Sequence, residues 1–396
     1  MVAAGARRRV SDCRESALPG VAASTRAWDA VVIGAGPAGS VAARGLARAG
    51  RAVLLVDRAK FPRDKVCGCC LAPAGVRALR EAGLGSVLHG AVRLRSLRLE
   101  QGGRGLDVAL PAYEVMDRTT LDARLLAQAR QAGCAILLGT RARVVRGGTV
   151  ELRDGRGSFE LTPRCIVVAS GMSAGVLPEE GAFAWRIRPG SRFGVGATLD
   201  RGAIELQAAE LLMLIAATGY LGAVRLPDGR VDLAAAFDPA AVRRAGGPGE
   251  LAAELLEQHG RDGTGARAAV WQGTPRLSRH RASVAAGRVL CIGDAAGYIE
   301  PITGEGMSWA IEGALRAVPV AMQVVAGADS SCWNRIYQRT LRRRQLQCSL
   351  VAGALRRPRV ARLCVRALRA APWLSDRLAG WATGRGTAHP AGMEPM

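Results

Sequence analysis

Lysine is almost absent from this chain of 396 residues: Lys60 and Lys65 are the only two, although lysine and arginine together number 55. Aromatic residues are also scarce, at 4%. The formal net charge of +22 therefore rests almost wholly on arginine. Proteins that bind single-stranded nucleic acid stack the bases on aromatic side chains, and no nucleic-acid-binding motif is visible. The composition thus predicts no nucleic-acid partner.

The chain also has no long apolar segment. Its longest apolar run, Leu211–Val224, is too short to span a bilayer and contains a Gly-Tyr step, so it predicts a buried strand pair or a core segment. Residues 1–28 carry Arg7, Arg8 and Arg9 but not the apolar core of a signal peptide. Without an export signal the ten cysteines are expected to be reduced, and we expect a cytoplasmic protein.

A glycine-rich turn lies near the N-terminus. The segment 29–58, DAVVIGAGPAGSVAARGLARAGRAVLLVDR, reads as strand, turn, helix and strand. Its first strand, 30–33, is apolar throughout, as in parallel strands that are buried on both faces. GAGPAG fits the G-x-G-x-x-G pattern of dinucleotide-binding turns, which place a pyrophosphate at a helix N-terminus. Asp57 ends the second strand, where a carboxylate can bind a ribose diol. The turn residues are Gly34, Gly36, Pro37, Ala38 and Gly39.

A second stretch of this kind lies near the C-terminus. Residues 287–314, GRVLCIGDAAGYIEPITGEGMSWAIEGA, read as a buried strand, a loop and a helix that starts near Gly306. Gly293 and Asp294 follow the strand, so we expect the carboxylate to face polar atoms of the cofactor. Pro301 restricts the loop, and the glycines at 304 and 306 allow the backbone to approach a flat ring.

These motifs resemble those of FAD-dependent oxidoreductases with the para-hydroxybenzoate hydroxylase fold, and among them the geranylgeranyl reductase-like branch. The matching pieces are VVIGAGPAG, LLVDR, FPRDKVCGCCLAP, MDRTTLDARLL and VLCIGDAAGYIEPITGEGM. The resemblance implies FAD as cofactor, with Asp294 at its ribityl chain. Arg58 and Arg118 are further implied contacts, although Arg118 also fits an exposed residue at a helix N-terminus. Against the isoalloxazine ring the resemblance places Pro301, Gly304, Glu305, Gly306 and Met307.

The implied fold class is α/β: an FAD-binding Rossmann-like domain, a parallel sheet with helices, interleaved with a mostly antiparallel β-sheet substrate domain and followed by a helical tail. Short apolar runs alternate with Gly, Asp and Pro over 183–275, so we expect sheet there rather than helices. The expected order is a disordered extension (1–28), FAD-binding segments (29–75, 111–180 and 279–330), substrate-domain segments (76–110 and 181–278) and a basic helical tail (331–396).

The chain departs from this family at several places. Hydroxylases of this fold carry Asp-Gly where this chain has Ser170-Gly171, and a second G-x-G-x-x-G is missing. The source of electrons stays open between NAD(P)H, bound transiently, and another protein. The halogenase motif Trp-x-Trp-x-Ile-Pro is missing too, and the reductase motif Tyr-x-Trp-x-Phe-Pro is reduced to Tyr220 and Pro227 in GYLGAVRLP. Tyr220 is a candidate cavity residue or plain strand packing.

The stretch KVCGCCLAP, residues 65–73, places Cys67 and Cys70 in a C-x-x-C pair with Cys69 beside it. Such a pair can be a redox dithiol or half of a zinc site. A second pair of Cys or His, which zinc needs, is not visible in the sequence, so we expect no metal. The resemblance places this loop beside the flavin, with Cys67 and Gly68 as candidate cavity residues and the other two cysteines as packing residues.

The C-terminal region is strongly basic: residues 335–385 contain 13 Arg and a single acid, Asp376. Within it, 360–371 has an amphipathic helical pattern, apolar on one face and arginine-rich on another. The apolar face either packs on the FAD-binding domain or makes peripheral contact with a membrane.

The resemblance predicts an FAD-dependent oxidoreductase that carries out C=C reduction or dehydrogenation on an apolar organic substrate: isoprenoid, polyketide or lipid-like. Two alternatives stay open. One is an NAD(P)H-dependent flavin monooxygenase of an aromatic or phenolic substrate, and the other is a non-catalytic flavoprotein that carries electrons or assists maturation. We assign no catalytic acid or base, and we interpret His280 and Arg281 as part of a solvated linker.

Overall fold

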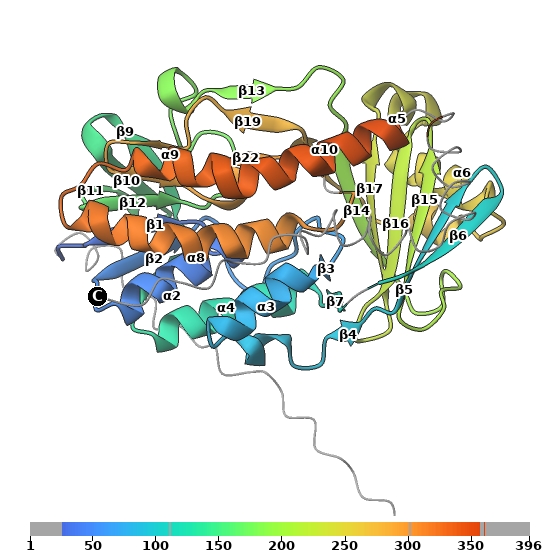
Figure 1. Ribbon diagram of the computed structural model, residues 1–396, viewed down its shortest axis with the longest axis horizontal. Coiled ribbons are helices and arrows are strands. Elements are labelled where there is room, and N and C mark those ends of the chain that lie inside the picture. Colours follow the sequence, from blue (N-terminus) through green and yellow to red (C-terminus); the bar gives the residue numbers. More distant parts are fainter. Residues whose placement is uncertain (1–25, 111, 301, 357–359, 361–396) are drawn as a thin grey trace, which may run out of the picture.

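A six-stranded sheet forms the centre of the first structural unit (Figure 1). The computed structural model describes residues 26–356 and 360, apart from 111 and 301. The strands run parallel except at one edge, and the central ones are apolar and buried on both faces. Their order is β20 (Ala285–Ala286), β21 (Val289–Cys291), β12 (Cys165–Val168), β1 (Ala30–Ile33), β2 (Val53–Asp57) and β8 (Ala135–Leu138).

One apolar core joins this sheet to α2 (Pro37–Arg48), α3 (Pro73–Glu81), α4 (Arg118–Gln131) and α8 (Gly306–Val325) (Figure 1). Proline opens α2 and α3, where its fixed φ suits the first turn, and Asp117 caps α4 by accepting a hydrogen bond from the Thr120 N–H at 2.7 Å. Between β8 and β12 the chain forms an antiparallel meander of β9 (Arg141–Val145), β10 (Thr149–Asp154) and β11 (Gly157–Leu161).

A seven-stranded sheet forms the second unit, on the right in Figure 1. Neighbouring strands are antiparallel, except that β15 and β5 run parallel. β15 and β16 pair with each other, which confirms the buried strand pair predicted over 211–224. The order is β18 (Gln272–Arg276), β14 (Phe193–Leu199), β17 (Val231–Phe237), β16 (Gly219–Arg225), β15 (Glu210–Ala216), β5 (Ser96–Gln101) and β6 (Arg104–Ala109).

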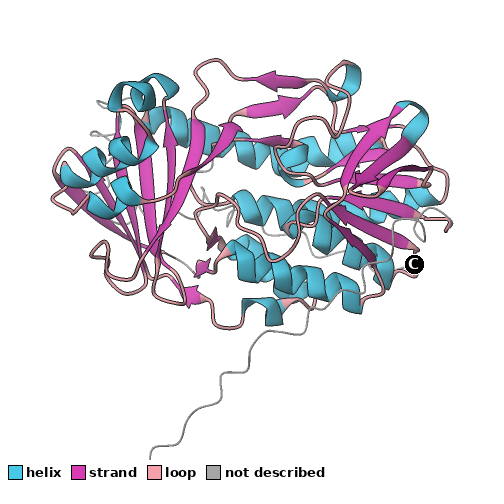
Figure 2. Ribbon diagram, turned by 180° about the vertical axis from the view of Figure 1, so that it is seen from behind, coloured by secondary structure: helices cyan, strands magenta, loops and turns pink. Residues whose placement is uncertain are grey.

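Side chains alternate between the two faces of this sheet. One face packs on α5 (Pro239–Ala245), α6 (Pro248–Glu257) and α7 (Thr264–Ala268), which lie on its outer side in Figure 2. The expectation of sheet alone over 183–275 is wrong at these three helices. The signal was present in PGELAAELLE, where Leu251 and Leu255 are one helical turn apart and both are buried.

Two small sheets and a C-terminal helical segment complete the fold. One sheet joins β13 (Trp185–Ile187), β19 (Arg279–Arg281) and β22 (Gly297–Tyr298), and the other joins β3 (Cys70–Leu71), β7 (Glu114–Val115) and β4 (Val92–Arg93). Then α9 (Cys332–Tyr337), a π-helical turn (Gln338–Arg342) and α10 (Arg343–Leu355) run along both units (Figure 1). Short 3-10 turns lie at Gly85–Leu88, Arg146–Gly148, Gly181–Phe183 and Gly293–Ala295.

The predicted fold class is confirmed: a parallel sheet with helices is interleaved with a mostly antiparallel sheet and followed by C-terminal helices. Within the segment 76–110 only β5 and β6 join the large sheet, whereas α3 packs with the first unit. Trp28 is buried in the main core, so packed structure begins before residue 29. The amphipathic pattern at 360–371 lies almost wholly outside the described residues. No helix in the described part of the chain is both long and apolar enough to cross a membrane.

Candidate functional site

The glycine-rich turn joins β1 to α2, and packing dictates two of its glycines. Gly34 has φ +107°, and a Cβ there would lie 2.4 Å from the Ala169 carbonyl oxygen. A Cβ on Gly39 would lie 1.7 Å from the Gly34 carbonyl oxygen. Gly36 is different, because the nearest atoms to an added Cβ are Nη2 of Arg63 at 3.6 Å and Nη2 of Arg118 at 3.8 Å. The turn therefore opens onto two guanidinium groups.

These guanidinium groups belong to a buried cluster of charges. Arg118 is 7% exposed and donates to both carboxylate oxygens of Asp122, at 2.9 and 2.8 Å. Nη2 of Arg63 lies 3.4 Å from Asp122 and 3.8 Å from Asp57. The charges around this cluster also act on Lys65. Burial lowers the pKa of its ammonium group, Arg118 lowers this pKa further, and Asp294 raises it. The structure thus excludes the alternative that Arg118 is an exposed helix residue, and it surrounds the turn with cations.

Asp57 and Arg58 end β2 beside this cluster. The Asp57 carboxylate accepts hydrogen bonds from the Ala35 N–H at 2.7 Å and from the Ala59 N–H at 2.8 Å. Each oxygen keeps a second lone pair for a ligand. Arg58 is exposed, and no structural contact ties it to the turn within the described residues. Its role as a cofactor contact stays a prediction.

The returning stretch 293–307 lies against the same turn. A Cβ on Gly293, which has φ +57°, would lie 3.0 Å from Cβ of Ala38. Burial raises the pKa of Asp294, and Lys65 and Arg118 counteract this rise. Gly304 has φ +69°, while Gly306 and Met307 open α8. Pro301 lies outside the described residues.

Helix α10 holds the loop that precedes α8. Arg344 donates to Oε1 of Glu305 at 2.7 Å, so this carboxylate points toward α10. One turn further, Sγ of Cys348 lies 3.4 Å from Oγ1 of Thr303. Glu300, also buried, forms ion pairs with Arg192 at 3.3 Å and with Arg356 of the same C-terminal segment. The loop expected to face the flavin is therefore fixed from behind by charged groups.

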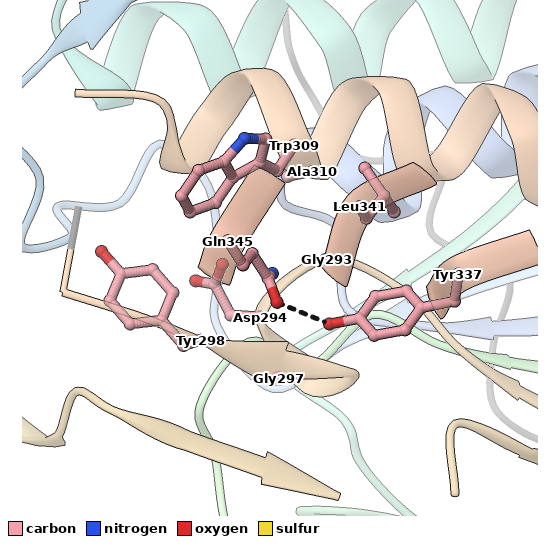
Figure 3. Close-up of a pocket in the computed structure, with 9 residues that line it drawn as sticks. All are labelled: Gly293, Asp294, Gly297, Tyr298, Trp309, Ala310, Tyr337, Leu341 and Gln345. Atoms are coloured by element: carbon pink, nitrogen blue, oxygen red, sulfur yellow. Dashed lines mark hydrogen bonds between the residues drawn. The ribbon is translucent and has the colours of Figure 1, made fainter. Parts of the chain in front are cut away.

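A small pocket lies between the Gly293–Tyr298 turn, the start of α8 and the C-terminal helices (Figure 3). Tyr337 donates to Oε1 of Gln345 at 3.1 Å at one side of it. The Trp309 Nε1–H has no partner among the described residues. Asp294 and Tyr298 also line the pocket, so the space behind the cofactor turn is closed by polar and aromatic groups.

The cysteine loop lies between the cofactor turn and the large sheet. A Cβ on Gly68 would lie 3.5 Å from Cβ of Ala234 in β17. A hydrogen bond from Cys69 lowers the pKa of the Cys67 thiol to about 6, with Arg118 helping and burial opposing. Burial raises the pKa of Cys70. The two members of the C-x-x-C pair therefore differ: one is a thiolate near neutral pH beside Arg118, and the other is a packed thiol.

The inner face of the large sheet forms a mostly apolar wall opposite the cofactor loop, and Asp232 of β17 is a buried carboxylate on this face. Tyr220 is 6% exposed and packs in one cluster with Met213, Ile215, Ala236 and Leu277, against Tyr298 and Ile302. Burial raises the pKa of Tyr220, and Glu300 adds to the rise. Between these residues the wall is lined by small ones, since Gly196, Gly222 and Ala234 lie at paired positions on the same face. An added Cβ on Gly222 would meet only ordinary contacts, at 3.6 Å or more.

Two further stretches that the sequence singled out are Ser170-Gly171 and His280-Arg281. The Oγ of Ser170 is buried without a partner in the described structure, and a Cβ on Gly171 would lie 2.8 Å from Nζ of Lys65. The interpretation of Arg281 as part of a solvated linker is wrong: it is buried, donates to the Ala295 carbonyl oxygen at 2.6 Å and lies 4.0 Å from the Trp185 ring centroid. Its neighbour His280 has a lowered pKa, first because of burial.

Sequence reasoning missed Arg63 and Lys65. Both lie in FPRDK, just before the cysteine loop, and Lys65 is one of only two lysines in the chain. The spacing of Arg118 and Asp122, one helical turn apart, was a signal for their ion pair. Among the described residues, no three His, Cys, Asp or Glu side chains are arranged to hold a metal ion.

The residues of the turn fit the pyrophosphate of FAD. The N-terminus of α2 presents backbone N–H groups to an anion, Gly36 leaves space, and Arg63 and Arg118 border that space. Arg63 Nε is buried without a partner in the described structure, and Asp57 lies at the end of the neighbouring strand. This is the donor set that a dinucleotide requires.

Comparison with known proteins agrees with this geometry. A family model described as an FAD binding domain matches residues 27–181. A menaquinone reductase of Mycobacterium tuberculosis is 31% identical over 312 residues, which cover 72% of this chain and 74% of the relative. A geranylgeranyl diphosphate reductase of Rhodobacter capsulatus is 37% identical over 121 residues, 30% of each chain.

Solved structures show the same fold. A flavin-dependent brominase superposes with a TM-score of 0.75 at 18% identity, covering 91% of this chain and 94% of that one. A geranylgeranyl bacteriochlorophyll reductase-like protein of Thermoplasma acidophilum superposes with a TM-score of 0.68 at 17% identity, covering 84% and 88%.

Proposed function

Because the chain belongs to the family of FAD-dependent oxidoreductases that includes the mycobacterial menaquinone reductases, we propose that it reduces a carbon–carbon double bond in an isoprenoid-bearing substrate. The names of two relatives, a menaquinone reductase and a geranylgeranyl diphosphate reductase, pair reduction with molecules that carry isoprenoid chains.

The observation that carries this proposal is the inner face of the large sheet. Its large side chains, Met213, Ile215 and Tyr220, are apolar or aromatic, and at Gly222 the atoms nearest to an added Cβ are 3.6 Å or more away. Aromatic residues are missing between Tyr220 and Pro227, and Gly222 lies two residues after Tyr220, on the same face of the strand. A surface of this kind suits a flexible hydrocarbon chain, which gains its binding energy from buried apolar area.

The chain's own residues would bind and orient the reactants. The turn at Gly36, with Arg63 and Arg118, would hold the pyrophosphate, and Asp57 and Asp294 would bind ribose and ribityl hydroxyls. FAD, when bound, supplies the hydride chemistry. The Cys67 loop and the apolar wall exclude water from the substrate. Cys67 and Gly68 are proposed to line the cavity with Tyr220.

The test is the product formed by the holoenzyme after chemical reduction under anaerobic conditions. Geranylgeranyl diphosphate and menaquinone are the probes. The menaquinone product is re-oxidised to the quinone first, so that reduction of the ring is not counted, and mass spectrometry then detects whether two hydrogen atoms were added to the isoprenoid chain. We expect this gain with at least one of them. Recovery of both probes unchanged, with bound flavin fully reduced, contradicts the proposal. A parallel reaction with NADPH or NADH identifies the electron source, which is proposed to be either a transiently bound nucleotide or a partner protein.

A monooxygenase is the second candidate, because a yeast squalene epoxidase is 48% identical over 61 residues, 15% of this chain. Repeating the assay with O2 admitted separates the two, since a monooxygenase needs O2 and adds one oxygen atom to its product.

A further inference from the structure

The outer face of the α9–α10 segment carries a row of arginines followed by exposed leucines. Arg335, Arg339 and Arg343 are exposed at intervals of four residues. Leu346 and Leu350 continue the row, with 50% and 69% of their surfaces exposed. Residues 332–356 contain six arginines and no Asp or Glu, and none of the three exposed arginines forms an ion pair with a described residue. The row therefore has unbalanced positive charge.

Strand β13 extends this surface sideways. Arg188 donates to Oγ of Ser349 at 2.6 Å, which fixes the end of β13 beside α10. Arg186 is exposed and pairs with His280 of β19 on one face of β13, whereas the next residue, Ile187, points to the opposite face. Burial, followed by Arg342 and Arg186, lowers the pKa of His280, so positive charge from both elements lies near His280. We name this the α10–β13 surface; its residues are Arg186, Arg339, Arg343, Leu346 and Leu350.

The opposite face of α10 is anchored in the protein. Arg344 pairs with Glu305 and with Glu312, and Cys348 is buried next to Thr303. The helix cannot rotate its leucines inward without breaking these pairs. The exposed leucines are therefore a fixed outward feature, and Figure 1 shows α10 running along the front of the molecule.

We propose that the α10–β13 surface docks on an anionic lipid bilayer. Exposed aliphatic side chains next to a row of arginines are what an interfacial helix needs, because the leucines enter the acyl boundary while the guanidinium groups bind phosphates. The clustering matters: Val270 is 87% exposed but lies far along the chain, in the loop before β18. Single exposed apolar residues are normal, whereas a cluster rimmed by charge marks an interaction site.

Two other occupants, the C-terminal residues 357–396 and nucleic acid, fit this surface less well than a bilayer does. Residues 357–396 contain seven Arg against Asp376 and Glu394, a balance of +5 with the same sign as the arginine row. Nucleic acid is disfavoured because the exposed side chains are aliphatic rather than aromatic. Strand β13 adds no negative charge to the surface, because it contains no Asp or Glu and the nearest acids in sequence, Glu179 and Glu180, lie before its start. Phospholipid headgroups fit both the charge and the leucines.

The test is flotation of the full-length, flavin-loaded protein with vesicles of phosphatidylcholine alone or mixed with phosphatidylglycerol. We expect binding to the mixed vesicles that weakens as salt is raised. The double change Leu346→Ser and Leu350→Ser should lower the partition coefficient by roughly tenfold or more, and Arg343→Glu by at least about fivefold. The matched controls are Val270→Ser, which is also exposed and apolar, and Arg104→Glu in exposed β6. Bound flavin and thermal melting show that each variant is folded.

Binding to the mixed vesicles that both α10 variants lose and both controls keep supports the proposal. Absence of binding to the mixed vesicles overturns it. Equal binding by all variants also overturns it, because another part of the chain would then dock. If gel filtration shows a dimer that the leucine variant splits into monomers, the surface binds a second copy and the proposal is likewise overturned. The experiment needs no substrate, so its result is independent of the proposed reaction.

Discussion

Replacing Arg344 with glutamine should weaken the attachment of α10 to the cofactor loop. Its guanidinium contacts Oε1 of Glu305 at 2.7 Å and both carboxylate oxygens of Glu312 at 2.8 Å. The Glu305 side chain is 1% exposed, so it cannot exchange this partner for water. It also precedes Gly306, the first residue of α8. The change thus leaves a buried carboxylate without its main counter-charge.

Removing one partner of a buried ion pair costs about 3–5 kcal/mol. An unfolding entropy of roughly 2.1 cal/mol/K per residue amounts to about 0.7 kcal/mol/K over ~330 residues. The melting temperature should therefore fall by about 4–7 °C. Glutamine can still donate a hydrogen bond, so the lower end of this range is expected. FAD affinity should fall with stability, because the loop next to the cofactor loses its support.

The loss of stability caused by Arg344→Gln should depend on pH. Burial raises the pKa of Glu305, and Arg344 opposes this rise, so without Arg344 the folded-state pKa is higher still. A carboxyl group whose folded pKa exceeds its unfolded pKa contributes stability below the unfolded value and loses it as pH rises through the folded value. The variant should thus be closer to the wild type near pH ~5 than near pH ~8.

The assay is thermal unfolding of the flavin-loaded protein at both pH values, with Arg343→Gln as the control. Arg343 is the preceding residue of α10 and is exposed, so its loss should change the melting temperature very little. Equal melting temperatures for the two variants would refute the reasoning. A deficit of the same size at both pH values would show that Glu305 is not the group left uncompensated.

Three further predictions concern the cofactor turn and the cavity. Gly39→Ala places a methyl group 1.7 Å from the Gly34 carbonyl oxygen, so the purified variant should hold no FAD; a flavin-to-protein ratio near that of the wild type contradicts this. Alkylation of Cys67, followed by mass spectrometry, should reach half its maximal rate at pH about 6, and Arg118→Gln should move this midpoint upward. A midpoint near the ordinary thiol value of about 8.5 is the opposing result. Gly222→Leu should fill the cavity and lower kcat/KM for an isoprenoid substrate by about tenfold or more, with FAD binding unchanged; unchanged turnover would place the substrate elsewhere.

The parts of the fold that local chemistry determines could be predicted from the sequence. Gly34 and Gly39 fill positions where any side chain collides with backbone, so the strand–turn–helix unit follows from the glycine spacing. The strands at 211–224 follow from their apolar run and the turn between them. The neighbours of Gly39 and of the paired strands lie close in sequence, whereas the Ala169 carbonyl group that excludes a side chain at Gly34 follows a different strand, β12.

The rest depended on contacts between distant segments. Arg118 reads equally well as buried or exposed until the loop with Arg63 and Lys65 is placed beside it. Arg281 looked solvated because the sequence does not show that Trp185 lies below its guanidinium group. The attachment of α10 through Arg344 links residues 39 positions apart, and no local pattern announces it.

Stopped-flow reoxidation of the reduced, flavin-loaded protein tests the central claim most directly. The visible absorption band of the flavin is followed under strictly anaerobic conditions after mixing with geranylgeranyl diphosphate, which has no quinone ring to accept the electrons. We expect the band to return in proportion to the substrate added, with one double bond reduced per flavin, and the rate to fall in Gly222→Leu. Return of the band only after O2 is admitted, with no response to geranylgeranyl diphosphate, would contradict the proposal.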